Sequence, residues 1–331
     1  MITGHLMLFA AAIVTFALCM YVLLDGFDLG VGALLLFPND EAIRDRMVDA
    51  IAPTWDGNET WLVLAGVSLF GAFPLAYSVL LPAFYLPIIL MLMALGCRGV
   101  SIEFRIQTET WRRFWDRVFG VGSIVAALSQ GLILGGAIQG VALSGHQFSG
   151  GVLDFLGPFP FLVALTTLLG YVCLGAAWLY LKGLNELQSL AATTLRIAAV
   201  LFAIAAVLTF AGAVAVQPQL LEVWSRLGSL LVLLAVVFLG LLCVAVVQIG
   251  RRGDALPFVC VSLAILLLIL GFALSVYPTV VPFRISYSEA SSASSSQGFI
   301  VVGAAIVIPV ILGYTILSYR IFKGKVESWS A

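Results

Sequence analysis

The 331-residue sequence is poor in charge, and this shortage decides the class of protein. Charged residues make up 10% of the chain and hydrophobic residues 62%, whereas soluble domains carry about 25% charged residues. The mean hydropathy of +1.13 points the same way. These values exclude an ordinary soluble fold and predict an all-α, polytopic membrane protein. The net charge of −1 gives no electrostatic basis for binding nucleic acid.

Residues that bind metals or act as nucleophiles are also scarce. Histidine occurs twice, at His5 and His146, and the five cysteines form no CxxC or CxxCH motif. The cysteines lie in or beside apolar runs, which is typical of small buried hydrophobic residues. The sequence contains no phosphate-binding loop, no metal-ligand cluster and no nucleophile–base pair. We therefore expect neither a catalytic residue nor a metal site in this chain.

Nine stretches are long and apolar enough to cross a hydrocarbon core of about 30 Å. Their approximate limits are 6–37, 60–80, 83–99, 118–143, 159–181, 197–216, 228–249, 258–277 and 299–321. Residues 1–331 are therefore predicted to form a single integral membrane domain. The first stretch lacks a preceding basic region and is too long for a signal-peptide core, so we interpret it as a retained span. Only Leu81 and Pro82 separate the second and third stretches, which predicts a tight hairpin or one broken unit.

The distribution of basic residues predicts the orientation. With nine spans, the odd-numbered loops and the C-terminal tail hold 14 of the 16 basic residues. They are Arg44, Arg46, Arg98, Arg105, Arg112, Arg113, Arg117, Lys182, Arg196, Arg251, Arg252, Arg320, Lys323 and Lys325. Because cytoplasmic loops are enriched in Lys and Arg, the N-terminus is predicted outside and the C-terminus in the cytoplasm.

The segment YVLLDGFDLGVG places two carboxylates, Asp25 and Asp28, in the first apolar stretch. An anion facing lipid costs about 2.5–3.5 kcal/mol on insertion scales. At ~1.5 Å per residue, Asp25 lies about 29 Å from Leu6, toward the cytoplasmic side. Gly26 and Gly30 form a GxxxG pair, which lets another helix approach closely. Asp25 is thus either a hydrogen-bonded packing residue or a buried proton-exchanging carboxylate. Asp28 is interpreted as a packing or hydrogen-bonding residue.

Two further segments place carboxylates on the same side. PTWDGNETW opens the second span, so Asp56 and Glu59 lie near a helix N-terminus. A structural role, in which the carboxylate complements the helix dipole, explains Glu59 well. For Asp56 this structural role and a functional role are about equally good explanations. In RGVSIEFR, Glu103 emerges at the inner end of the third span. Asp25, Asp56 and Glu103 could line a proton route. The alternative is that they pair with nearby arginines, namely Arg44, Arg98 and Arg105.

Together these segments resemble subunit II of the cytochrome bd quinol oxidase family. The matching elements, in family order, are YVLLDGFDLGVG, IAPTWDGNETWL, FPLAYSVLLPAFY, RGVSIEFR followed by WRRFWD, and YPTVVPF. The compact chain is similar to the cyanide-insensitive branch. The stretch 286–297 departs from the aromatic-acidic pattern of the corresponding loop, so no site is assigned there. Its Ser-rich composition predicts a solvated external loop.

The resemblance implies a nine-helix subunit of two four-helix bundles and one peripheral helix, in a heterodimer with a homologous subunit I. Subunit I would carry the quinol site, two haems b and one haem d, and a small single-helix accessory subunit is a further candidate partner. The complex would oxidise quinol, reduce O2 to water and take protons from the cytoplasm of a bacterial cell. Some relatives also hold a structural quinone in this subunit, which the sequence leaves open.

The resemblance also assigns residues. Asp25 and Asp56 match acidic positions of a proton-uptake pathway, and Glu103 matches a third position in a more variable context. Structural or packing roles are expected for Gly26, Asp28, Gly30, Trp55, Gly57, Asn58 and Arg98. Taken without the resemblance, composition and Asp25 also allow a proton-coupled secondary transporter or a purely structural membrane scaffold.

Overall fold

The computed structural model describes residues 2–251 and 253–326, with side chains from His5 onward. Residues 1 and 327–331 of the predicted domain lie outside this range. So does Arg252, one of the basic residues on which the predicted orientation depends. The described chain consists of helices and two small hairpins. The helices are α1 (Ile2–Leu34), α2 (Glu41–Asp49), α3 (Trp55–Ala72), α4 (Pro74–Ala83), α5 (Tyr85–Gln107), α6 (Arg112–Gln139), α7 (Pro158–Lys182), α8 (Asn185–Val216), α9 (Gln219–Val247), α10 (Ala255–Val276), α11 (Tyr287–Ala290) and α12 (Ser294–Ile321). The antiparallel hairpins pair β1 (Leu143–Ser144) with β2 (Gln147–Phe148), and β3 (Thr279–Val281) with β4 (Ile285–Ser286).

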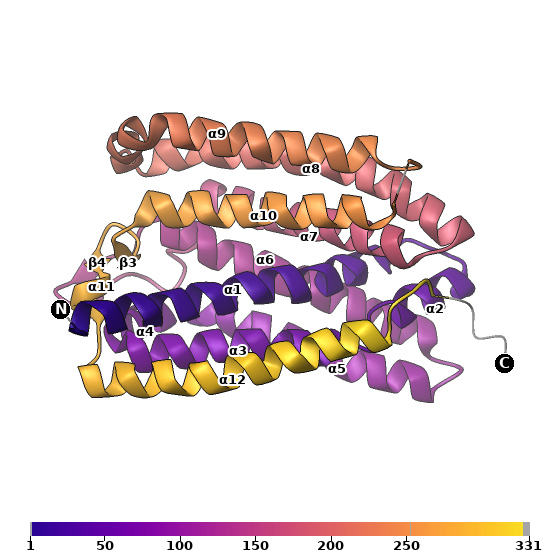
Figure 1. The fold of residues 1–331 in the computed structure, drawn as a ribbon, viewed down its shortest axis with the longest axis horizontal. Helices are drawn as coiled ribbons and strands as arrows, with labels where there is room; N and C mark the ends of the chain where they lie inside the picture. The colour runs from indigo at the N-terminus through magenta and orange to yellow at the C-terminus, as the bar shows by residue number, and fades with distance from the viewer. Residues whose placement is uncertain (1, 252, 327–331) are drawn as a thin grey trace.

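The long helices lie side by side along the longest axis of the molecule (Figure 1). Among the described residues, eight are long and apolar enough to cross a membrane: α1, α5, α6, α7, α8, α9, α10 and α12. The prediction of an all-α, polytopic membrane fold is therefore confirmed. Helix α3 is 18 residues long and begins with the polar sequence WDGNET, but it packs along α1.

The packing order divides the helices into neighbouring groups. α1 packs against α3, α6 and α7, while α5 packs mainly against α6. α7 also packs against α8 and α10, and α9 lies against α8 and α10. α12 contacts α1 and α3 at the lower edge of Figure 1, and α8 and α9 form the opposite edge.

The second and third predicted spans, 60–80 and 83–99, have different limits in the structure. α3 ends at Ala72, and α4 begins with Pro74 after a non-helical Phe73 with φ −132° and ψ 61°. Proline disfavours helical conformation in the residue before it, which explains this break. Leu81 and Pro82 therefore lie inside α4, and the second break falls at Phe84. The connection is a broken helical unit rather than a tight hairpin.

Several other helices begin earlier than their apolar stretches. α8 starts at Asn185 rather than at residue 197, and α9 at Gln219 rather than at residue 228. The first three turns of α8 contain polar residues, but Leu187, Ala191 and Leu195 are fully buried on one face. An amphipathic start is stabilised by packing on one side and is missed when only continuous apolar runs are counted.

The Ser-rich segment after α10 contains a short helix and buried residues, which the prediction of a solvated loop did not include, although residues 293–296 are exposed. Ser286 and Glu289 form a capping box at the start of α11, in which each side chain accepts from the other residue's backbone N–H. Ile285 and Ala290 are buried, and the Ser292 N–H donates to the Ala72 carbonyl at 2.9 Å. Ser-x-x-Glu is a helix-start signal, and the apolar residues around it pack the segment against α1 and α4.

Candidate functional site

Arg98 on α5 lies at the centre of a buried ionic cluster between three helices. Its Nη2 donates to Asp25 Oδ1 of α1 at 2.5 Å and also to Glu59 Oε1 of α3. The side chains of Arg98 and Asp25 are completely buried, whereas that of Glu59 is 27% exposed. The cluster thus connects a carboxylate at the protein surface to one that is fully enclosed.

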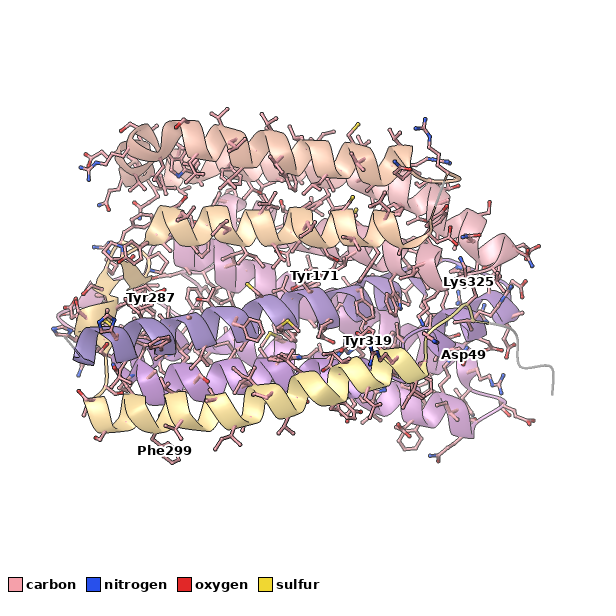
Figure 2. All side chains as sticks on the ribbon, viewed as in Figure 1. Asp49, Tyr171, Tyr287, Phe299, Tyr319 and Lys325 are labelled. Carbon is pink, nitrogen blue, oxygen red and sulfur yellow. The ribbon has the colours of Figure 1, made fainter. Side chains whose placement is uncertain are left out.

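Asp28 joins the same region through Asn58. The Asn58 Nδ2 donates to Asp28 Oδ2 at 2.7 Å and to the Leu24 carbonyl at 3.2 Å. The Tyr319 hydroxyl of α12 donates to Asn58 Oδ1 at 3.2 Å. Figure 2 shows Tyr319 in the half of the molecule that contains α2. Asn58 therefore links α1, α3 and α12 while both of its polar atoms are used.

The glycines beside Asp25 bring α1 into direct backbone contact with α7. A Cβ atom on Gly30 would lie 1.8 Å from the backbone oxygen of Tyr171 and 3.0 Å from the nitrogen of Gly175. One on Gly26 would lie 2.7 Å from the Tyr171 ring. Any side chain at Gly30 would force the two helices apart, so this face of α1 is closed by protein, as expected of a GxxxG pair.

A separate chain of hydrogen bonds starts at the hydroxyl of Tyr21, a buried residue one turn before Asp25 on α1. The Gln130 Nε2 of α6 donates to this hydroxyl at 2.7 Å, and the Tyr171 hydroxyl of α7 donates to Gln130 Oε1 at 2.6 Å. Figure 2 shows Tyr171 near the middle of the long axis. These hydrogen bonds connect α1, α6 and α7 close to the buried Asp25.

The structure separates the other two predicted proton-route residues from this cluster. Asp56 and Glu103 are exposed, and neither side chain forms a hydrogen bond or ion pair with another described residue. Asp56 lies in the first turn of α3, one turn before Glu59. Glu103 lies on α5, one turn beyond Arg98.

Two predicted packing residues at the start of α3 touch neighbouring helices. The indole of Trp55 covers Gly99 of α5, because a Cβ there would lie 3.1 Å from the ring. Gly57 lies beneath Tyr314 of α12, whose ring would be 2.8 Å from a Cβ atom. These contacts hold the WDGNETW segment between α5 and α12 and so position Asn58 and Glu59.

A second buried ionic cluster was not predicted. Asp116 on α6 is fully buried and accepts from Arg44 Nε at 2.7 Å and from Arg105 Nε at 2.5 Å. Arg105 also donates to Asp45 Oδ1 at 2.7 Å. The cluster ties α2 to the adjoining ends of α5 and α6. The signal for it was Asp116 in WRRFWD, an acidic residue in a segment with two arginines and directly before Arg117.

The two histidines do not fit axial ligation of a buried haem. His5 is exposed, and the His146 side chain is 60% exposed in the turn between β1 and β2, within 3.8 Å of Glu289. No group of three or more His, Cys, Asp and Glu residues in the described chain suits a metal ion.

The chain belongs to a known class of membrane oxidase subunits. The family model for cytochrome bd terminal oxidase subunit II matches residues 6–322. The chain belongs to this family, as the sequence resemblance predicted.

The sequences of individual relatives align with this chain over nearly their whole length. The chain is 30% identical to cytochrome bd-I ubiquinol oxidase subunit 2 of Escherichia coli K12, with 92% of this chain and 91% of the relative covered. It is 31% identical to the probable cytochrome oxidase subunit 2 of Haemophilus influenzae, with 92% and 90% covered. It is 28% identical to cytochrome bd ubiquinol oxidase subunit 2 of Bacillus subtilis, with 93% of each covered. The fold matches a chain of the bd oxidase from Geobacillus thermodenitrificans with a TM-score of 0.78 at 17% identity, covering 96% of this chain and 98% of that one.

Proposed function

We propose that this chain is the non-haem subunit II of a bd-type terminal quinol oxidase, which couples quinol oxidation to the reduction of O2 to water. The observation that carries the proposal is the family match from residue 6 to residue 322, with relatives of similar length. The protein is a multi-pass protein of the bacterial plasma membrane. It acts as one part of an oxidoreductase, not as a separate enzyme.

Within this assembly, the whole chain forms one membrane domain that pairs with a haem-bearing subunit I. The two haems b, the haem d and the quinol site belong to that partner, consistent with the exposed positions of His5 and His146. Nine helices cross the membrane when α3 is counted with the eight longer ones. α1, α3, α5 and α6 form one four-helix bundle, α7 to α10 form the other, and α12 is peripheral; their packing order supports this division.

The end of the molecule that contains α2 faces the cytoplasm. Support comes from the arginines gathered there, including Arg44, Arg105 and Arg112, since basic residues favour the cytoplasmic side. α1 begins at the opposite end (Figure 1). The N-terminus is therefore outside.

The acidic residues at this cytoplasmic end form a proton-uptake route. Asp56, exposed one turn before Glu59, and Glu103, exposed one turn beyond Arg98, collect protons from the cytoplasm. Glu59 then exchanges protons with the enclosed Asp25 across Arg98. The partial exposure of Glu59 and the complete burial of Asp25 support this direction of transfer.

Purification of the tagged chain from native membranes tests the oxidase assignment. We expect a second subunit to co-purify, and a reduced-minus-oxidised spectrum to contain haem b and haem d bands. A complex without these bands, or a chain purified alone with solute-uptake activity after reconstitution, would overturn the assignment. A small third subunit or a bound quinone would be identified in the same preparation by mass spectrometry.

A further inference from the structure

The charges around Arg98 do not balance. Asp25, Asp28 and Glu59 together carry three formal negative charges, and Arg98 supplies one positive charge. Asp25, Asp28 and Arg98 are all completely buried. A buried ionised carboxylate without a countercharge is so costly that the group takes up a proton instead. At least one carboxyl in this cluster is therefore expected to be neutral.

Unused hydrogen-bonding atoms indicate where this proton lies. Asp25 Oδ2 and Asp28 Oδ1 are buried and have no hydrogen-bond partner among the described residues. The two residues are three positions apart on α1, so their side chains lie on the same face of the helix. Two carboxylate oxygens can only accept hydrogen bonds, and one must carry a proton before they can bond to each other.

We propose that Asp25 and Asp28 share one proton at neutral pH, which makes Asp28 a proton-holding residue rather than a packing residue. The proton resides on Asp28, because Asp25 is the one paired directly with Arg98. Arg98 Nε and Nη1 are likewise buried without a partner in the described part of the chain. They can donate to a water molecule that connects the two carboxyl groups, since buried waters bond to otherwise unsatisfied polar groups.

The neighbours of the pair favour this state. Five of the helices around the pair contribute neutral or acidic groups, and α5 contributes Arg98. The groups are Tyr21 on α1, Asn58 and Glu59 on α3, Gln130 on α6, Tyr171 on α7 and Tyr319 on α12. The Asn58 amide donates to Asp28 Oδ2, which leaves Oδ1 to carry the proton. Like-charged carboxylates sharing one site hold one proton between them for the same reason.

The use of this proton in catalysis rests on the proposed function, but its presence can be measured without turnover. Infrared spectroscopy of the purified complex should reveal a protonated-carboxyl C=O band that shifts in D2O and when aspartate is labelled with ¹³C at its side-chain carboxyl. Asp28→Asn should abolish the band, while the exposed Asp56→Asn should retain it. Where Asp28→Asn does not assemble, Asp28→Glu serves instead, because a glutamate carboxyl carries no label from aspartate and the band should then lose its ¹³C shift.

The outcomes distinguish the shared proton from the proton-uptake route of the proposed function. A band that fails to shift with labelled aspartate, or that persists in an assembled Asp28→Asn complex, overturns the shared proton. A band lost in Asp28→Asn, together with normal O2 consumption by an Asp25→Asn complex, preserves the shared proton and overturns the proton route.

Discussion

Replacement of Arg98 by methionine removes the single cation that the structure places between Asp25 and Glu59. Arg98 and Asp25 are fully buried, so the variant leaves a carboxylate enclosed without its partner. Breaking such a pair costs about 3–5 kcal/mol. The Glu59 contact adds little, because a partly exposed ion pair is screened by solvent. The expected loss in the free energy of unfolding is therefore about 3–5 kcal/mol.

The loss should be measured by titrating the detergent-purified complex with SDS and following tryptophan fluorescence. Arg112→Met is a matched control, because its pairs with Glu41 and Asp45 are partly exposed and each is worth no more than about 1 kcal/mol. Apolar replacement of all three cluster members, Arg98→Met with Asp25→Leu and Glu59→Met, should recover most of the loss. A single variant as stable as the control, or a triple variant no better than the single one, would refute the reasoning.

Three further changes test the packing and the second cluster. Gly30→Leu should cost at least about 3 kcal/mol in unfolding free energy, because its Cβ would overlap a backbone oxygen of α7. Gly66→Leu serves as control in the same titration, since a Cβ atom at Gly66 has no neighbouring atom within 4 Å. Asp116→Asn should destabilise by about 3–5 kcal/mol, since it removes the anion shared by two buried arginines, and a loss below that of a surface substitution would contradict the assigned pairing. Ser286→Ala should cost about 1 kcal/mol through loss of the helix cap, and an unchanged thermal midpoint would show that the cap does not stabilise the segment.

Features of the site that depend on a single helix could be predicted from the sequence. The position of Asp25 along α1 and the glycine face beside it follow from spacing, because rise per residue and side-chain direction are fixed in a helix. The partners of Asp25 depend on how three helices meet. From the sequence, Glu59 is explained by its place at the start of a helix. In the structure it accepts a hydrogen bond from Arg98, which lies 39 positions later.

A useful signal for this cluster was nevertheless present. Arg98 lies within an apolar helix, where a charge is expensive and requires a partner. Asp28 and Asn58 were predicted to have structural roles, and their mutual hydrogen bond could not be deduced, since it depends on the rotation of α3 against α1. The helix break at Phe73 was missed because hydropathy continues across it, although Pro74 marks the position.

The most direct test of the account is the rate of O2 consumption by the purified complex carrying Asp25→Asn, with its haem content measured in the same sample. Asparagine keeps the size of the side chain but cannot exchange a proton. If Asp25 lies on the proton-uptake route, we expect full haem content and a rate lowered by about 100-fold, the scale of a positioned proton-transfer group. Full haem content with an unchanged rate at every pH would contradict the account.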